Sequence, residues 1–342
     1  MKHIGCVFWK RGCKVSSKIL VTGGAGYIGS HTVRKLINDG YDILVYDNFS
    51  TGHKSLIKGV PFIDGDLGDK KKLCKTMKDN HIDAVIHFAA STEVGESVAN
   101  PRKYYENNLL NGLHLLNAMV ELNINKIVFS SSCATFGEPD KIPIDENEKQ
   151  WPINPYGWTK FMFERILHDY DAAYGLKSVC LRYFNAAGAD PHGDIGEMHE
   201  PETHVVPILL QVAMGVRESF SIFGTDYDTP DGSCIRDYVH VLDLADAHEK
   251  AIAYLNNHQK SNCFNLGTGN GVSVLELIET VESVTGCKLN IIEKERRPGD
   301  PDQLIANSKK AQEILGWRPI HSDVCNIIKT AWEWQRKCLH DV

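Results

Sequence analysis

The chain has 342 residues, and its content of 42% hydrophobic and 24% charged residues is ordinary for a folded globular protein, so disorder is not expected. The net charge of -7 provides no general basic field, which argues against nucleic acid as the main partner and leaves anionic ligands to local arginines. No apolar run approaches the roughly 18 residues of a membrane-spanning helix, so no membrane partner is expected.

Residues 1–17 precede the first predicted strand and lack a convincing signal-peptide core and cleavage site, so we interpret them as an N-terminal extension. The ten cysteines contain no C-x-x-C pair, which indicates neither a zinc ribbon nor a compact disulfide framework. Reduced thiols in the cytoplasm are therefore the expected state.

A glycine-dense turn near the start of the chain joins the first predicted strand to the first predicted helix. The apolar residues 18–21 predict the strand, and the i, i+3, i+4 apolar spacing beyond the turn predicts the helix. Between them, Gly24-x-Gly26-x-x-Gly29 fits the dinucleotide fingerprint, and the overlapping Gly23-x-x-Gly26-x-x-Gly29 fits its variant. Backbone N–H groups and the helix N-terminus would then face a pyrophosphate.

A second apolar strand, residues 43–46, ends at Asp47, eighteen residues beyond Gly29. An acidic side chain there would accept the adenosine ribose hydroxyls and repel a 2′-phosphate, so we expect NAD rather than NADP. A purely structural glycine turn is the alternative, and the strand and acid at the expected distance argue against it.

Strand and helix alternate five times by residue 130, with further strands at 60–63, 83–90 and 126–129 and helices at 71–80 and 101–122. This alternation predicts an α/β fold with a doubly wound parallel sheet of the Rossmann type, whose ligands lie at the carboxyl ends of the strands. We expect an NAD-binding domain over residues 18–188. The residues expected at strand ends are the glycine turn, Asp47, Asp66, Ala89, Ala90 and Ser130 to Ser132.

A helix predicted over residues 156–174 carries Tyr156 and Lys160 four residues apart, so both lie on one face. Free tyrosine, with a pKa near 10, is a weak base; a lysine ammonium one turn away, with a bound nicotinamide cation, would favour the phenolate. Tyr156 could then take a proton from a substrate hydroxyl while Ser132 hydrogen-bonds the same oxygen, and hydride would pass to NAD.

The loop of residues 190–204 is crowded with histidine and acidic residues, which could bind a metal. Because they have no compact ligand spacing, we expect no metal and favour a solvated loop that covers a ligand. The residues concerned are His192, Asp194, Glu197, His199, Glu200, Glu202 and His204.

We expect residues 189–342 to form mainly a smaller substrate-binding lobe, with segments near 236–268 returning to the first domain. The glycines of residues 263–271 imitate a second dinucleotide turn, but no strand with an acid follows at the proper distance, so a structural turn is the better interpretation. Ser273-x-x-Glu276 predicts a capping box at the next helix start.

Several motifs together resemble the UDP-glucose 4-epimerases, which are extended short-chain dehydrogenases/reductases. The resemblance runs from about Lys18 to near the C-terminus. The motifs are Thr22 to His31, His87-Phe88-Ala89-Ala90, Val94 to Val98, Ser130 to Ser132, Tyr156-x-x-x-Lys160, Arg182 to Asn185, Arg236 to Val241 with Asp243, and Asn265-Leu266-Gly267.

The resemblance implies a tightly bound NAD and a homodimer. It also implies that Tyr156 deprotonates the sugar 4-hydroxyl, that hydride leaves C4 for NAD, and that the 4-keto sugar turns over before hydride returns to its opposite face. Ser132, Tyr156 and Lys160 would be catalytic. The implied NAD contacts are Gly23, Gly26, Tyr27, Ile28, Gly29, Asp47, Asn48, Asp66, Leu67, Phe88, Ala89, Ala90, Asn107, Ser130, Tyr156, Lys160 and Tyr183.

The implied UDP-sugar pocket places Arg236 and Arg297 on the diphosphate, where guanidinium groups suit phosphate geometry. Leu304 stands where bacterial members restricted to unacetylated sugars tend to carry tyrosine, so a roomier pocket that also accepts UDP-GlcNAc and UDP-GalNAc is expected. The pocket residues are Ser132, Tyr156, Asn185, Val205, Phe223, Arg236, Arg297, Asp300 and Leu304.

Two departures and three alternatives accompany this resemblance. Phe136 replaces a tyrosine of some members, and residues 1–17 have no counterpart. A 4,6-dehydratase usually has Asp-Glu where this chain has Cys133-Ala134, which argues against that reaction. Epimerases of UDP-xylose, UDP-arabinose or UDP-glucuronate are closer alternatives, and a non-catalytic NAD-binding regulator would not need Ser132, Tyr156 and Lys160.

Overall fold

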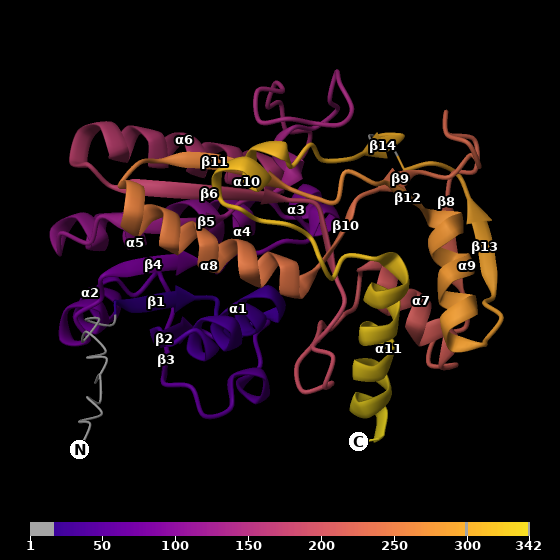
Figure 1. The fold of residues 1–342 in the computed structure, drawn as a ribbon, viewed down its shortest axis with the longest axis horizontal. Helices are drawn as coiled ribbons and strands as arrows, with labels where there is room; N and C mark the ends of the chain where they lie inside the picture. The colour runs from indigo at the N-terminus through magenta and orange to yellow at the C-terminus, as the bar shows by residue number, and fades with distance from the viewer. Residues whose placement is uncertain (1–16, 298–299, 341–342) are drawn as a thin grey trace, which may run out of the picture.

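A computed structural model describes residues 17–297 and 300–340 (Figure 1), so the expected N-terminal extension lies outside the described residues except for Ser17. The chain forms two lobes that lie side by side. The larger is built on a seven-stranded sheet and the smaller on three helices and a two-stranded sheet, as expected for a Rossmann domain with a second α/β lobe.

The large sheet is entirely parallel, which confirms the predicted doubly wound fold, and its order is β11-β6-β5-β4-β1-β2-β3. Sequential order reverses between β1 and β4, which is where ligands bind in such sheets. The strands are β1 (Lys18–Thr22), β2 (Asp42–Asp47), β3 (Phe62–Asp64), β4 (Ala84–His87), β5 (Lys126–Ser130), β6 (Lys177–Tyr183) and β11 (Asn262–Leu266).

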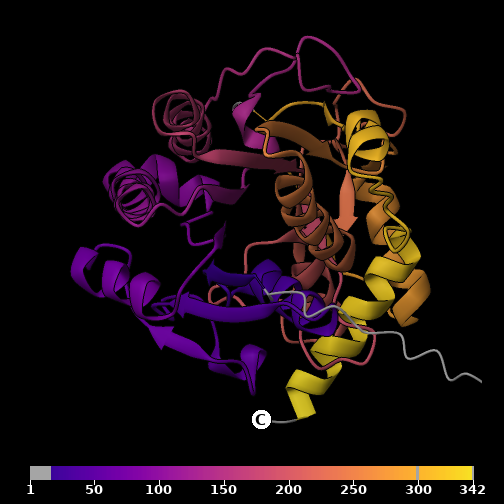
Figure 2. The ribbon, with the colours of Figure 1, turned by 60° about the vertical axis from the view of Figure 1, so that its left-hand side comes forward.

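Alternating side chains of β1 fill two separate cores because successive residues of a strand point to opposite faces. Ile19 and Val21 pack with α1 (Tyr27–Asn38) and α8 (Val241–His258). Leu20 packs on the opposite face, and Figure 2 shows helices on both sides of the sheet. The helices of that second face are α2 (Lys70–Asp79), α5 (Asn111–Glu121) and α6 (Pro155–Tyr174).

The helix predicted over residues 101–122 is present but interrupted. It begins as α4 (Pro101–Tyr104), continues as a π-helical segment labelled η2 (Tyr105–Leu110), and ends as α5. Because a π segment inserts extra backbone into a helix, it changes which side chains face the sheet. The hydrophobic period did not show this interruption.

The smaller lobe has its own core, which includes Leu209, Leu277 and Ile328. Its helices are α7 (Val205–Ala213), α9 (Val274–Thr285) and α11 (Val324–His340), and its two-stranded sheet joins β8 (Phe220–Phe223) to β13 (Ile291–Lys294). The predicted capping box of Ser273 and Glu276 is present at the start of α9.

Short strands connect the lobes. They form the pair β7 (Asn185–Ala187) with β10 (Tyr238–His240), and the three-stranded sheet of β12 (Val272–Ser273), β9 (Ile235–Arg236) and β14 (Gln303–Leu304). Of the segments near 236–268, α8 and Val239 of β10 pack in the first core and β11 pairs with β6 of the large sheet, whereas β9 lies in the three-stranded sheet. The C-terminal tail also reaches the first core, through Ala311 of α10 (Lys309–Ile314) and through Trp317.

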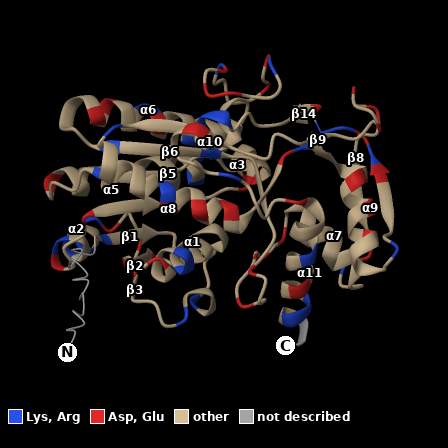
Figure 3. Ribbon diagram, in the orientation of Figure 1, with Lys and Arg blue, Asp and Glu red and all other residues tan. Residues whose placement is uncertain are grey.

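Acidic and basic residues are interspersed over both lobes (Figure 3), so positive charge for an anionic ligand is local. Among the residues that the structure describes, no helix has the length and apolar character needed to cross a bilayer. The seven cysteines from Cys74 to Cys325 are free thiols, in agreement with the expected reduced state.

Replacing Gly29 by alanine is expected to destabilise the protein by about 1–3 kcal/mol, because the added Cβ would lie 2.3 Å from the Gly23 carbonyl oxygen. Gly95 in α3 (Val94–Ala99) is the matched control, since a Cβ there meets nothing within 4 Å and helix propensity favours alanine. Denaturant unfolding measures both variants. Equal stability of Gly29→Ala and wild type would contradict the steric argument.

Candidate active site

The glycine turn lies at the carboxyl end of β1, as predicted. Gly23 has a φ of +71°, and a Cβ there would lie 2.5 Å from the Ala89 amide nitrogen, so glycine is required by packing. Gly26 is the N-cap of α1, and a Cβ on it would meet only the Gly23 carbonyl, at 3.4 Å. The space before the helix N-terminus therefore remains open, which suits a pyrophosphate.

Asp47 closes the glycine turn from the neighbouring strand. Its Oδ2 accepts a hydrogen bond from the Ala25 N–H at 2.9 Å and its Oδ1 accepts one from the Phe49 N–H at 2.8 Å. Burial raises the pKa of Asp47, and these two N–H groups act against the rise. Because each carboxylate oxygen has a second lone pair, the expected ribose contact stays compatible with this geometry.

Several further residues of the expected NAD site lie just after strands β2, β3 and β4. Asn48 donates to Asp66 at 2.7 Å after β2 and β3, and the Phe88 ring after β4 lies 4.5 Å from that of His248. The Leu67 side chain is buried in the second core. Only the backbone of Leu67 can therefore meet a cofactor.

Lys160 and the serine run come together at the carboxyl end of β5. The Lys160 ammonium is buried and donates to the Ser130 carbonyl at 2.7 Å, and the Ser130 hydroxyl contacts the Tyr183 hydroxyl. Ser132 caps the short helix η3 (Cys133–Thr135) by accepting from the Ala134 N–H at 3.1 Å. Burial lowers the pKa of Lys160 to about 7.

Tyr156 lies beside this group, and its environment differs from the expected one. Burial raises its pKa well above the usual value and Tyr183 adds to the rise, while a hydrogen bond with Ser132 opposes it. The Lys160 nitrogen lies 5.8 Å from the centre of the Tyr156 ring. In the chain without a nicotinamide cation, desolvation of both side chains dominates, so the expectation that this cation and the Lys160 ammonium together favour the phenolate stays a prediction.

A buried ion pair between Glu164 and Arg182 contacts the serine run. Glu164 of α6 accepts from the Arg182 Nη2 at 2.6 Å and also from the Ser131 hydroxyl, and both charged side chains are 6% exposed. No sequence motif pointed to Glu164, because only the packing of α6 on β6 places it beside Arg182.

The π-helical segment adds a second supporting residue that no sequence motif indicated. Buried Asn108 accepts from the Ser91 N–H at 2.7 Å and donates to the Thr159 hydroxyl at 3.1 Å. It thereby fixes the loop after β4 to the helix of Tyr156. Asn107, which was expected to contact NAD, donates to the Ser91 hydroxyl at 3.2 Å.

The expected UDP-sugar residues lie at the junction of the lobes. The two arginines have different partners there, an acidic side chain for Arg236 and an aromatic ring for Arg297. Arg236 donates to Asp300 at 2.6 Å, whereas the Arg297 guanidinium lies 3.9 Å from the centre of the Phe223 ring. Asn185 begins β7 and Val205 begins α7. None of these contacts tests a role on the diphosphate.

Leu304 lies opposite Arg236 in the small sheet, at the same junction. It packs against the buried cluster of Phe136, Ile144, Phe184 and Ala306, against which Cys133, the neighbour of Ser132, also packs. One apolar cluster therefore joins the expected substrate-range position to the serine run.

Asp237 accounts for the conformation of the glycine-rich turn of residues 263–271. Its buried carboxylate accepts from the N–H groups of Thr268, Gly269 and Ala306 at 2.8, 3.0 and 3.1 Å. A Cβ on Gly267 would lie 2.5 Å from this carboxylate. The turn therefore encloses a side chain of the protein, in agreement with its interpretation as structural.

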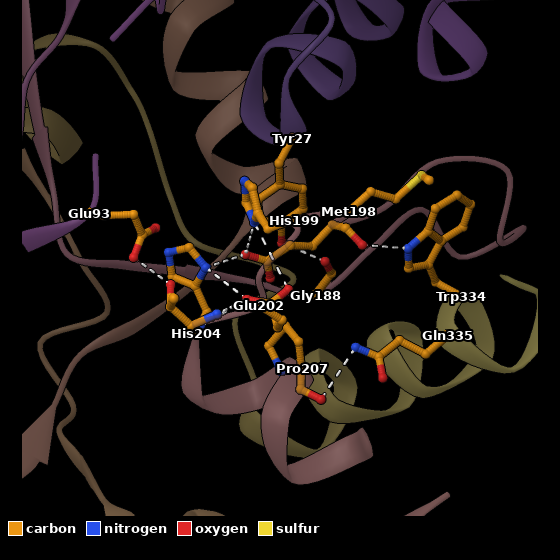
Figure 4. A network of polar contacts seen from close by, with 12 residues as sticks. Tyr27, Glu93, Gly188, Met198, His199, Glu202, His204, Pro207, Trp334 and Gln335 are labelled. Carbon is orange, nitrogen blue, oxygen red and sulfur yellow. Dashed lines mark hydrogen bonds and ion pairs between the residues drawn. The ribbon is translucent and has the colours of Figure 1, made fainter. Parts of the chain in front are cut away.

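The loop of residues 190–204 is not solvated throughout, contrary to expectation. His192 and Asp194 are exposed, but the side chains of Glu197 and Glu202 are only 7% and 6% exposed. Both carboxylates lie within 4.8 Å of ring nitrogens of His199 and His204, and Figure 4 shows Glu202 beside His199 and His204. The Trp334 indole donates to the Glu197 backbone carbonyl at 2.9 Å, and two N–H groups of the same loop donate to Glu202.

Comparison with known proteins gives a consistent result. The model of the NAD dependent epimerase/dehydratase family matches residues 19–267. A UDP-glucose 4-epimerase of Rhizobium meliloti is 51% identical over 322 residues, which are 94% of this chain and 98% of the relative.

Solved structures of epimerases are similar to this chain in fold and in sequence. A UDP-glucose 4-epimerase from Brucella ovis in complex with NAD has a TM-score of 0.91 and 48% identity, covering 93% of this chain and 98% of that one. The UDP-Glc/GlcNAc 4-epimerase from Campylobacter jejuni has a TM-score of 0.84 and 41% identity, covering 94% and 100%.

Arg182→Met is expected to destabilise the protein by about 3–5 kcal/mol, because it leaves the Glu164 carboxylate buried without its cation. The double variant Arg182→Met/Glu164→Leu removes both charges and is expected to lie closer to wild type. Unfolding free energies of the two single variants and the double variant complete the cycle. Losses that simply add would show that the two charges do not interact.

Proposed function

The chain belongs to the NAD dependent epimerase/dehydratase family, and from this premise we propose that it interconverts UDP-glucose and UDP-galactose by inverting C4. It is an enzyme that depends on NAD. The observation that carries the proposal is the buried group of Ser132, Tyr156 and Lys160 at the strand ends, beside the open glycine turn.

The residues present fit NAD. The open N-terminus of α1 at Gly26 suits the pyrophosphate and Asp47 suits the adenosine ribose, while Lys160 and Tyr183 would flank the nicotinamide end. NAD, when bound, supplies a hydride acceptor that can return the hydride to either face of a ketone. Net redox change is then zero.

The protein's part in the reaction is to move one proton and to hold one oxygen. Tyr156 accepts the proton of the sugar 4-hydroxyl, and Ser132 hydrogen-bonds the same oxygen. Because burial keeps the Tyr156 phenol neutral in the chain alone, the base form requires positive charge beside it. Lys160 supplies part of that charge when protonated, and its ammonium is oriented by the Ser130 carbonyl. A 4-keto sugar would result when the 4-hydroxyl loses this proton and C4 loses its hydride to NAD.

We propose that the substrate range extends to UDP-GlcNAc and UDP-GalNAc. Leu304 and Cys133 pack against the same buried cluster, so the size of residue 304 is expected to affect the space near Ser132. The similarity to a UDP-Glc/GlcNAc 4-epimerase supports this extension. We also infer a homodimer in the cytoplasm, which the family resemblance and the free thiols support.

Tyr156→Phe is expected to lower kcat by about 10²–10⁴-fold while NAD stays bound, because only the proton acceptor is removed. A coupled assay of UDP-galactose turnover, with NAD content from the denatured protein, measures both quantities. Tyr174→Phe is the control, since Tyr174 ends the same helix with 61% exposure. Unchanged turnover in Tyr156→Phe would overturn the proposed mechanism.

Leu304→Tyr is expected to lower kcat/KM for UDP-GlcNAc by about tenfold or more relative to UDP-glucose, because the larger ring would take up space at the junction of the lobes, opposite Arg236. Leu304→Met conserves volume and should leave the ratio unchanged. Competition between the two sugars measures the ratio. A wild-type enzyme that turns over UDP-glucose but no acetylated sugar would refute the extended range without affecting the C4 epimerisation.

A further inference from the structure

Four side chains of one loop converge on a single point, outside the Ser132, Tyr156 and Lys160 group. The loop connects β7 to α7, and the residues are Glu197, His199, Glu202 and His204 (Figure 4). Each offers one ligand atom, and these atoms all lie within 4.8 Å of one another.

We propose that this cluster is a binding site for one divalent transition-metal ion, for which zinc is the best match. A tetrahedral zinc site with bonds of about 2.0–2.1 Å has ligand atoms about 3.3 Å apart. The Glu197 Oε1 lies 3.2 Å from the Nδ1 of His199 and 2.9 Å from that of His204. The Glu202 Oε2 lies 4.0 Å from the Nδ1 of His199, and the Glu202 Oε1 lies 3.1 Å from the Nδ1 of His204. Two imidazoles with two carboxylates form a donor set that suits zinc better than magnesium or calcium.

The charge of the cluster calls for a cation. Both carboxylates are nearly buried, with side chains 7% and 6% exposed. In the described part of the chain, neither Glu197 nor Glu202 forms an ion pair with a lysine or an arginine. Neutral imidazoles leave two negative charges out of water, which is costly unless they are compensated. One divalent ion balances both; protonation of both imidazoles is the competing solution.

An unsatisfied atom gives an independent indication. The Nδ1 of His199 is buried and has no hydrogen-bond partner, although it lies 3.2 Å from the Glu197 Oε1. Buried polar atoms in proteins are nearly always paired. A buried imidazole nitrogen that lies 3.2 and 4.0 Å from two carboxylates without a hydrogen bond is available as a metal ligand.

The backbone around the cluster is held from several directions. Glu202 Oε1 accepts from the N–H groups of Thr203 and His204, both at 2.8 Å, which leaves Oε2 available. The Trp334 indole donates to the Glu197 carbonyl at 2.9 Å, and the Thr203 hydroxyl donates to Glu93 at 2.6 Å. Such outer contacts orient ligands before the metal arrives.

The position of the cluster indicates a structural role. Four protein ligands close a tetrahedral site and leave no position for a substrate. His204 immediately precedes Val205, the first residue of α7, and Tyr27 of the glycine turn lies over His199 in Figure 4. The ion would therefore tie this loop between the expected NAD turn and the expected sugar pocket. This inference does not depend on which sugar the enzyme uses.

Metal content of the full-length protein is the first test. Protein purified without a metal-binding tag, incubated with zinc and dialysed against metal-free buffer, should retain about one ion per chain by mass spectrometry. Cobalt(II) in place of zinc should give the intense visible absorption of a four-coordinate ion. Dipicolinate should remove the ion and lower the melting temperature, because a ligand bound only by the folded state stabilises it.

Matched variants locate the site. His199→Gln and Glu202→Gln should each weaken zinc binding on the order of 100-fold or more, since each removes one ligand. The exposed residues of the same loop provide controls, His192→Gln and Glu200→Gln, which should bind zinc like wild type. The Glu202→Gln amide can still accept the Thr203 and His204 N–H groups, which favours a folded variant.

A wild-type protein that retains no zinc or cobalt, and whose melting temperature neither metal nor chelator changes, would overturn the proposal. That result would assign the charge balance to protonated imidazoles. Metal bound equally by wild type and by both ligand variants would also overturn it, since the ion would then lie elsewhere.

Discussion

The close approach of two backbone segments at the switch point of the sheet fixes the rest of the site. The Thr22 carbonyl at the end of β1 accepts from the N–H groups of Phe88 and Ala89, at 2.9 and 3.1 Å. Only a glycine at position 23 permits this approach, because a Cβ would overlap the Ala89 nitrogen. The contact aligns the glycine turn with the ends of β4 and β5. The glycine turn and the serine run therefore lie at the same edge of the sheet, where ligands bind in folds of this type.

Desolvation is the main influence on the pKa values of Tyr156 and Lys160 in the chain alone. Burial moves the pKa of Tyr156 up and that of Lys160 down to about 7, so both shifts favour neutral side chains near neutral pH. An acid–base pair kept neutral in this way responds strongly to any charge that enters, because the local dielectric is low. Glu164, in contrast, is paired with Arg182 at 2.6 Å and accepts from the Ser131 hydroxyl, so it links α6 to the serine run.

The sequence was informative where a local pattern decides the outcome. Continuous apolar runs predict the parallel strands, and the spacing of Tyr156 and Lys160 predicts a shared helix face. The fold, the strand-end position of the expected NAD residues and the serine run followed from such patterns. Contacts between distant segments did not follow, as with Trp317, which enters the first core from the C-terminal tail. The π segment was also invisible, because one extra residue in a turn hardly changes the hydrophobic period, yet it gives Asn108 its position.

The same limitation explains why the loop of residues 190–204 was misjudged. Acidic and histidine residues in a loop favour a solvated interpretation, and only tertiary packing removes them from water. The Tyr27 hydroxyl donates to the Gly188 carbonyl at 2.5 Å, and Trp334 of α11 donates to Glu197. The loop is thus held at its start by the glycine turn and at its centre by the smaller lobe. Tyr27 belongs to the first turn of α1. A movement of this loop would therefore displace the helix N-terminus at which the cofactor is expected to bind.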